Sequence, residues 1–208
     1  QISLLEAGQY PFYYGKVELC SLLTEILLDN YSTFSVNGIE PQIEIPDVNI
    51  YLNADRKACI RIIQNLIFNA ITSTTSNVVV QLIYNTDSVQ LCIKNPIATI
   101  PTEEYSKLLE RFYVADISRS NGTSGQGLYI VKKLLLLMNC KNPIIEIQDH
   151  IFKITIDFSP LLIKKLVEEE PSNEYITFFR EHGLLDVNED NNPIVMKCKF
   201  KKNEGIDQ

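Results

Sequence analysis

Two asparagines, Asn65 and Asn69, stand four positions apart in a stretch that is otherwise nearly all apolar. On a helix this spacing puts both carboxamides on one face. An amide oxygen suits a hard cation such as Mg²⁺, and because it is neutral it does not repel phosphates that share the metal. The pair therefore indicates a site for a metal and a phosphate. The alternative is two asparagines that satisfy backbone groups near the end of a helix.

A glycine-rich loop over 121–126 leads into a predicted helix that begins at Gly127. Gly122, Gly125 and Gly127 let backbone N–H groups approach a ligand without interference from a Cβ atom. The N-terminus of a helix carries unsatisfied donors and the positive end of the helix dipole, which favour phosphate. The pattern GxxxxGK[ST] is absent, so the loop is not a P-loop. An ordinary mobile Gly/Ser loop is the alternative interpretation.

Residues 110–113, Glu-Arg-Phe-Tyr, stand just before that loop. An aromatic pair at a hinge can anchor a lid that opens and closes over a ligand. The alternative is that Phe112 and Tyr113 are core residues at the end of a helix. Arg111 and Arg119 are long enough to reach a phosphate, and solvation of both side chains is the competing interpretation.

Helices interleaved with hairpins must position these residues. Apolar residues at helical spacing predict helices over 17–31, 56–73, 102–112 and 127–138. Short apolar or alternating runs bounded by turn residues predict strands over 42–46, 49–52, 78–84 and 89–94 and a second hairpin within 143–158. Asp55 can cap the second helix. This order is typical of an α+β sandwich of one sheet and one helical layer. Beyond Ser159, a helix over 172–182 and a strand over 194–200 predict a small folded appendage.

Composition excludes several classes of protein. The 208 residues carry a net charge of -7, which argues against binding to nucleic acid or to an anionic membrane. No apolar run is long enough to span a bilayer. The five cysteines are scattered and lack a CxxC pair, which argues against a disulfide framework or a zinc site and favours a reducing compartment.

The order and spacing of three motifs resemble the ATP-binding catalytic domain of two-component sensor histidine kinases, within the gyrase/Hsp90/histidine kinase/MutL ATPase superfamily. Asn65 and Asn69 match the N box, residues 110–113 match the F box, and residues 125–128 (Gly-Gln-Gly-Leu) match the last glycine box. The resemblance covers about residues 1–159. It implies a two-layer α/β sandwich of the Bergerat type, with a mixed sheet covered by helices. It also implies a junction from the dimerisation helices over 1–16, a catalytic domain over 17–159, and an appendage of unknown role over 160–208.

The resemblance implies a site for ATP and Mg²⁺. Asn69 would hold the Mg²⁺ with Asn65 beside it, the glycines at 125 and 127 would lie under the phosphates, and residues 114–124 would form the ATP lid. The implied ATP-binding residues are Asn65, Asn69, Asn95, Ile100, Arg111, Phe112, Tyr113, Arg119, Gly122, Gly125, Gln126, Gly127 and Leu128.

By the same resemblance, the γ-phosphoryl group would pass to a histidine on a dimerisation domain outside this chain. The full-length protein would then be a homodimer that relays the signal to a response regulator. The chain starts at Gln1, without Met or a signal-peptide pattern. We therefore expect the cytoplasmic part of a longer, membrane-anchored sensor, with no nucleic-acid partner and no membrane insertion of its own.

The middle glycine box departs from the family pattern D-x-G-x-G, because residues 95–99 read Asn-Pro-Ile-Ala-Thr. Asn95 can still accept a hydrogen bond from the adenine amino group, but as a neutral and weaker acceptor. Ile97 and Thr99 replace glycines, and Thr72 stands where many relatives carry a basic residue. These departures motivate an alternative, a catalytically weak or inactive module that works by nucleotide sensing or protein interaction. An anti-sigma-type serine kinase shares the fold but lacks the leading junction sequence.

Overall fold

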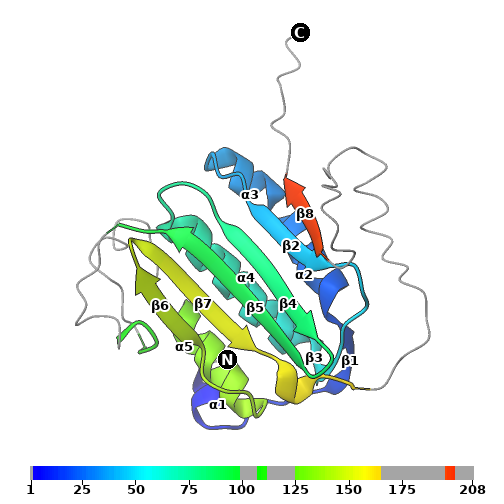
Figure 1. Cartoon of the computed structure of the whole chain (residues 1–208). Helices are drawn as coiled ribbons and strands as arrows, with labels where there is room; N and C mark the ends of the chain where they lie inside the picture. Colours follow the sequence, from blue (N-terminus) through cyan, green and yellow to red (C-terminus); the bar gives the residue numbers. More distant parts are fainter. Residues whose placement is uncertain (1, 99–106, 112–124, 165–194, 200–208) are drawn as a thin grey trace.

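The computed structural model of the chain describes residues 2–98, 107–111, 125–164 and 195–199 (Figure 1). Within them, a mixed sheet of six strands runs in the order β6-β7-β5-β4-β2-β8. The strands are β2 (Gln42–Pro46), β4 (Val79–Asn85), β5 (Ser88–Pro96), β6 (Ile144–Gln148), β7 (Ile151–Asp157) and β8 (Val195–Lys199). β2 and β4 are parallel, and every other neighbouring pair is antiparallel. The predicted lid over 114–124 and the predicted helix over 172–182 lie outside the described residues. The strand predicted over 194–200 is observed as β8.

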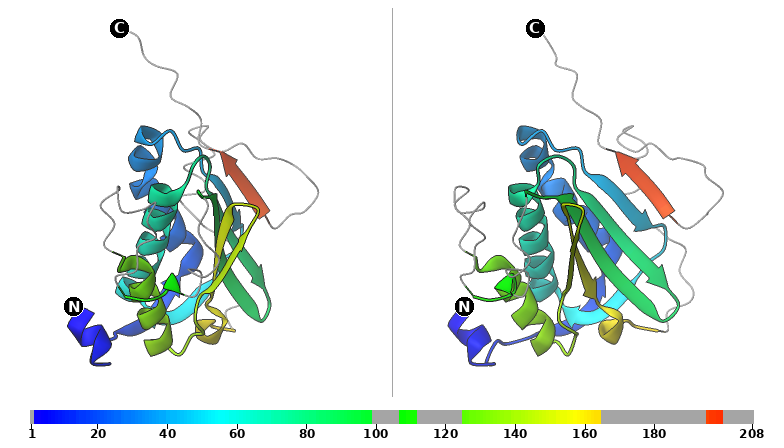
Figure 2. Two further views of the ribbon diagram at one scale, coloured as in Figure 1. Left: turned by 90° about the vertical axis from the view of Figure 1, so that its left-hand side faces the viewer. Right: turned by 60° about the vertical axis from the view of Figure 1, so that its left-hand side comes forward.

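Helices cover one face of this sheet, as Figure 2 shows from the side. The long ones are α2 (Leu19–Asp29), α4 (Arg56–Ser73) and α5 (Gly127–Leu137). The short α1 (Ile2–Glu6) lies beside α5, and α3 (Tyr31–Val36) follows α2. The predicted α+β sandwich is therefore confirmed, with helices on one face of a mixed sheet. Most of the helix predicted over 102–112 lies outside the described residues, and residues 107–111 form a turn.

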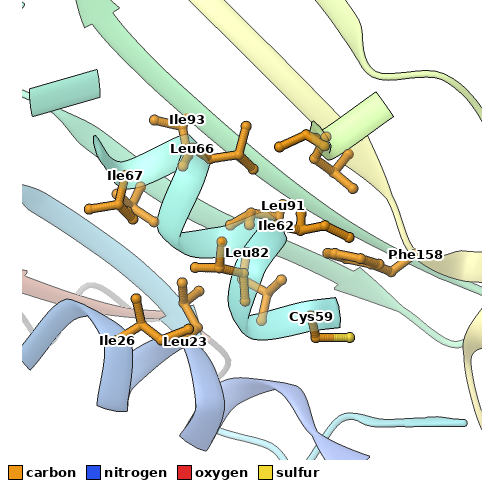
Figure 3. Packing of buried hydrophobic residues seen from close by; sticks show 14 of the residues in the cluster. Leu23, Ile26, Cys59, Ile62, Leu66, Ile67, Leu82, Leu91, Ile93 and Phe158 are labelled. Atoms are coloured by element: carbon orange, nitrogen blue, oxygen red, sulfur yellow. The ribbon is translucent and has the colours of Figure 1, made fainter. Parts of the chain in front are cut away.

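The core lies between α4 and the inner face of the sheet (Figure 3). Ile62 and Leu66 of α4 pack toward Leu82 of β4 and Leu91 of β5, and all four are buried. Full burial of such an aliphatic side chain contributes about 1.5–3 kcal/mol relative to exposure. This packing fixes the rotation of α4 about its own axis, and so decides which of its residues face away from the sheet.

The start of α2 differs from the prediction. Residues 14–18 form a strand, β1 (Tyr14–Glu18), which pairs antiparallel with β3 (Tyr51–Asp55) in a separate two-stranded sheet. The helix begins after it because the Glu18 carboxylate accepts hydrogen bonds from the N–H groups of Cys20 and Ser21. The predicted start at Val17 was wrong, since the partner strand of β1 lies far along the sequence. The predicted helix over 17–31 also breaks at Asn30, and the strand predicted over 49–52 runs instead from Tyr51 to Asp55.

The segment after β7 is bonded to both sheets. The hydroxyl oxygen of Ser159 accepts from the N–H of Val89 in β5 at 3.0 Å. The N–H of Ile163 donates to the carbonyl of Tyr51 in β3 at 2.8 Å. Further along, β8 pairs antiparallel with β2 and forms one edge of the large sheet (Figure 1). The division of the chain at residue 159 stays a prediction.

Candidate functional site

α4 presents the two asparagines, and Asp55 sets where that helix begins. The Asp55 side chain is 2% exposed. One of its carboxylate oxygens accepts from the N–H of Ala58 at 2.8 Å, and the other accepts from the N–H of Tyr13 at 2.6 Å. The sheet-facing residues of α4 are buried, whereas Asn65 and Asn69 are half-buried one turn apart on another face. The predicted cap and the predicted bounds of this helix are confirmed.

Asn65 meets the first residue of α5. Its Nδ2 donates to the carbonyl of Arg61 at 2.6 Å, which directs Oδ1 away from that carbonyl. A Cβ atom added to Gly127 would lie 3.1 Å from Asn65 Oδ1, closer than ordinary van der Waals contact. The absence of a side chain at residue 127 thus allows the start of α5 to approach α4 at Asn65. The two segments predicted to share a site are in contact.

The N-terminus of α5 resembles an anion site in its hydrogen bonding. Gly125 has a φ of 62°, a left-handed conformation that favours glycine. Gln126 takes the N-cap position, and its side chain makes no capping hydrogen bond. Its carbonyl accepts the first helical bond, from the N–H of Ile130 at 2.9 Å. Within the described part of the chain, the donors at the start of α5 are therefore left for a ligand, and Leu128 packs against the core behind them.

Asn69 stands one turn beyond Asn65. Its backbone carbonyl accepts from the hydroxyl of Ser73 at 2.7 Å and from that of Thr72 at 3.3 Å. None of the residues described here hydrogen-bonds its carboxamide, which leaves an amide oxygen on a half-buried surface. In the same ranges, His, Cys, Asp and Glu nowhere gather in a group of three that could hold a metal. A cation at this face would therefore rely on amide oxygen and on oxygens of its own ligand.

Asn95 is buried near the end of β5, with 1% of its surface exposed. Its Nδ2 donates to the hydroxyl oxygen of Ser73 at 3.2 Å and to the carbonyl of Pro96 at 3.4 Å. Its Oδ1 is buried and has no hydrogen-bond partner among the described residues. Such an orphaned acceptor costs about 1–3 kcal/mol until a donor reaches it. No motif in the sequence singles out Ser73, so its part in this network was missed.

Ile97 is built into the core instead of leaving open space. It is 6% exposed, and its N–H donates to the carbonyl of His150 at 2.8 Å. Ile97, at a position where the family motif has glycine, is therefore part of the hydrophobic core just after β5. Thr72 carries no charge, and its hydroxyl donates to the carbonyl of Phe68 at 2.9 Å.

Arg111 pairs with the first helix of the chain. Its guanidinium donates to Glu6 Oε1 at 2.6 Å, and the hydroxyl of Tyr129 on α5 donates to the same oxygen at 3.3 Å. Glu6 was not foreseen as a neighbour of the site. The remaining predicted site residues lie outside the described ranges; they are Ile100, Phe112, Tyr113, Arg119 and Gly122.

Cys20, Cys59 and Cys140 are buried, and their thiols are protonated at neutral pH. Burial raises the pKa of Cys59 and that of Cys140 to about 12, and burial also raises the pKa of Cys20. A thiol reacts or binds metal as its thiolate, so these side chains take no part in chemistry at neutral pH.

The chain matches a known protein family over the region that holds the predicted site. Residues 54–172 match the family described as histidine kinase-, DNA gyrase B-, and HSP90-like ATPase. The chain belongs to this ATPase family. The matched region includes α4, Asn95 and the start of α5, which hold the predicted site residues.

The chain is similar to curated sensor kinases. The sensor histidine kinase YcbM of Bacillus subtilis is 28% identical over 137 residues, which cover 64% of this chain and 44% of YcbM. This chain thus spans less than half the length of YcbM.

Solved structures share the fold of this chain. The catalytic domain of the histidine kinase ThkA superposes with a TM-score of 0.61 and 20% identity, covering 71% of this chain and 97% of that one. Full-length ShkA in complex with AMPPNP gives a TM-score of 0.61 and 18% identity, covering 74% and 33%. The fold is that of histidine kinase catalytic domains. Across the described residues, no helix is both long and apolar enough to cross a membrane.

Proposed function

We propose that this chain is the catalytic domain of a sensor histidine kinase. It binds Mg-ATP and passes the γ-phosphoryl group to a histidine on a dimerisation domain outside this chain. The contact between Asn65 and Gly127 carries the proposal, because it joins the asparagine face of α4 to the uncapped start of α5. The membership of the ATPase family supports a nucleotide as the ligand.

Three features of the described residues fit ATP. The orphaned Oδ1 of Asn95 suits a base that offers an N–H donor, such as the amino group of adenine. The backbone donors at the start of α5 suit phosphate, and the glycine at residue 127 lets them approach it. The carboxamide of Asn69 suits Mg²⁺, which takes oxygen ligands and keeps several waters.

When bound, Mg-ATP supplies the phosphoryl group and neutralises part of its charge. The residues of this chain then bind and orient it. Asn95 holds the base, the start of α5 holds phosphate through backbone N–H groups, and Asn69 holds the metal. Thr72 adds no positive charge to this set, so within it phosphate would be held by backbone donors and the metal. The transfer needs mainly positioning and charge neutralisation, and these are the roles that the named residues would supply.

The relatives that are sensor kinases support the wider setting of this proposal. We place the chain on the cytoplasmic side of a membrane-anchored sensor. That sensor forms a homodimer through its dimerisation domain and passes the phosphoryl group on to a response regulator.

Autophosphorylation of the full-length protein tests the proposal. The protein is incubated with Mg²⁺ and ATP that carries a radioactive γ-phosphate, and the label is then tested for the acid lability of phosphohistidine. Asn69→Ala should abolish labelling, because the amide oxygen for the metal is lost. Asn53→Ala removes an exposed carboxamide on β3 and serves as the matched control, which should label normally.

Two results would contradict the proposal. Normal labelling of Asn69→Ala would show that the metal is held elsewhere. A wild-type protein that binds Mg-ATP but never becomes labelled would favour the non-catalytic module.

A further inference from the structure

Ser73 connects Asn95 to Asn69 through a hydrogen-bond chain with a fixed direction. The Ser73 hydroxyl donates to the backbone carbonyl of Asn69 at 2.7 Å. A serine hydroxyl has one proton, so once it is donated to Asn69 the oxygen can act toward Asn95 only as an acceptor. The Asn95 atom that faces it at 3.2 Å must therefore be the donor Nδ2.

The carbonyl of Pro96 favours the same orientation through a longer contact. A carbonyl oxygen only accepts, and it lies 3.4 Å from Asn95 Nδ2. A flipped carboxamide would set Asn95 Oδ1 against this carbonyl and against the Ser73 oxygen, acceptor against acceptor. The hydrogen-bond partners of an amide distinguish its oxygen from its nitrogen, and both acceptors here require Nδ2 of Asn95 on their side. Oδ1 is the atom left buried without a partner among the described residues.

We propose that Ser73 is a positioning residue that holds the Asn95 carboxamide with its oxygen as the free acceptor, and so makes the site select adenine over guanine nucleotides. This assignment rests on the nucleotide binding proposed above. Adenine carries an exocyclic amino donor where guanine carries a carbonyl acceptor. An unrestrained asparagine can turn either its oxygen or its nitrogen toward the base, and so can suit both. An ionised aspartate offers acceptors alone and needs no such restraint.

Calorimetric titration of Mg-ATP and Mg-GTP into this chain measures the selectivity as the ratio of the two affinities. The wild-type chain should favour ATP by about tenfold or more, since an acceptor facing the guanine carbonyl leaves both groups without a donor. Ser73→Ala removes the shorter of the two contacts that hold the carboxamide, leaves only the 3.4 Å contact with the Pro96 carbonyl, and should reduce the ratio severalfold. Ser73→Thr keeps a hydroxyl and should preserve the ratio.

The aspartate background separates positioning from a general structural effect. Asn95→Asp should favour ATP, and adding Ser73→Ala to it should leave the ratio unchanged, because a carboxylate has no wrong orientation. A structural defect caused by Ser73→Ala would instead lower the affinity for both nucleotides in both backgrounds.

The outcomes separate this assignment from the proposed function. Equal affinity of the wild-type chain for ATP and GTP would overturn the assignment and leave nucleotide binding intact. So would a Ser73→Ala variant that keeps the wild-type ratio, or that loses it equally in both backgrounds. Absence of heat with either nucleotide would remove the proposed function, and this assignment with it.

Hydrogen exchange of the Asn95 side-chain amide tests the restraint without any nucleotide. Its NMR signals are assigned by their loss in Asn95→Asp. They should exchange with water more slowly in the wild-type chain than in Ser73→Ala. Equal exchange rates in these two proteins would contradict the restraint.

Discussion

Gly127→Ala tests the contact on which the proposed site depends. The new methyl group would lie 3.1 Å from Asn65 Oδ1 and 3.8 Å from Asn65 Cγ. The side chain of Asn65 cannot move freely, because its Nδ2 donates to the carbonyl of Arg61 at 2.6 Å. The substitution therefore either breaks that hydrogen bond or pushes the start of α5 away from α4.

Two opposing effects set the size of the change. Alanine is favoured over glycine in a helix by up to about 1 kcal/mol. Overpacking of a close contact costs about 1–3 kcal/mol. We expect Gly127→Ala to lower the free energy of unfolding by about 1 kcal/mol in the wild-type chain. In an Asn65→Ala background the nearest remaining atom is Cβ, at 3.9 Å, which is ordinary contact. There, the same substitution should raise the free energy of unfolding by about 0.5–1 kcal/mol.

Urea unfolding of the wild-type chain, both single variants and the double variant gives the coupling energy, which should be about 1.5–2 kcal/mol. Gly15→Ala is the control, because a Cβ atom there meets nothing within 4 Å. Its effect should be the same with and without Asn65→Ala. If Gly127→Ala changed the free energy of unfolding equally in both backgrounds, the proposed contact between α4 and α5 would be refuted.

Three further predictions concern stability. Asp55→Ala removes the acceptor of two backbone N–H groups and should lower the free energy of unfolding, measured in urea, by about 2–3 kcal/mol. Asp55→Asn should lower it less, because one amide oxygen remains as an acceptor. Glu6→Gln should cost under about 1 kcal/mol, and the loss should shrink with added salt, because its ion pair with Arg111 is partly exposed. Burial raises the pKa of Cys59 and Cys140 from 9.0 to about 12. As the pH rises, these thiols therefore ionise in the unfolded chain before they ionise in the folded one. The free energy of unfolding should fall between pH 9.0 and about 12. Cys59→Ala should make that fall less steep in urea unfolding at increasing pH, and an unchanged slope would contradict the assignment.

Local signals in the sequence predicted the element that carries the site. The helix over 56–73 was predicted to its observed bounds, because its apolar spacing and the cap at Asp55 are both local. β1 was missed because its five residues have no strong pattern and are held by pairing with β3, far along the chain. The sequence around Glu18 therefore looked like the start of a helix, whereas it is the end of a strand that caps one.

The site also combines features that local sequence signals predict with contacts between distant segments that they do not predict. The asparagine pair and the glycines were visible as motifs, but the contact between Asn65 and Gly127 depends on how α5 packs on α4. Ser73 could not be identified, because a serine near a helix end is common and its partner on β5 stands 22 positions away. The pairing of Arg111 with Glu6 spans 105 positions, and nothing local in either segment indicates it.

Calorimetric titration of ATP into this chain, with and without Mg²⁺, tests the central claim most directly. We predict a heat of binding with Mg²⁺ and weaker binding without it. Asn69→Ala should bind ATP with the same affinity in both conditions. Absence of heat at millimolar ATP in the presence of Mg²⁺ would contradict the claim that this domain binds nucleotide.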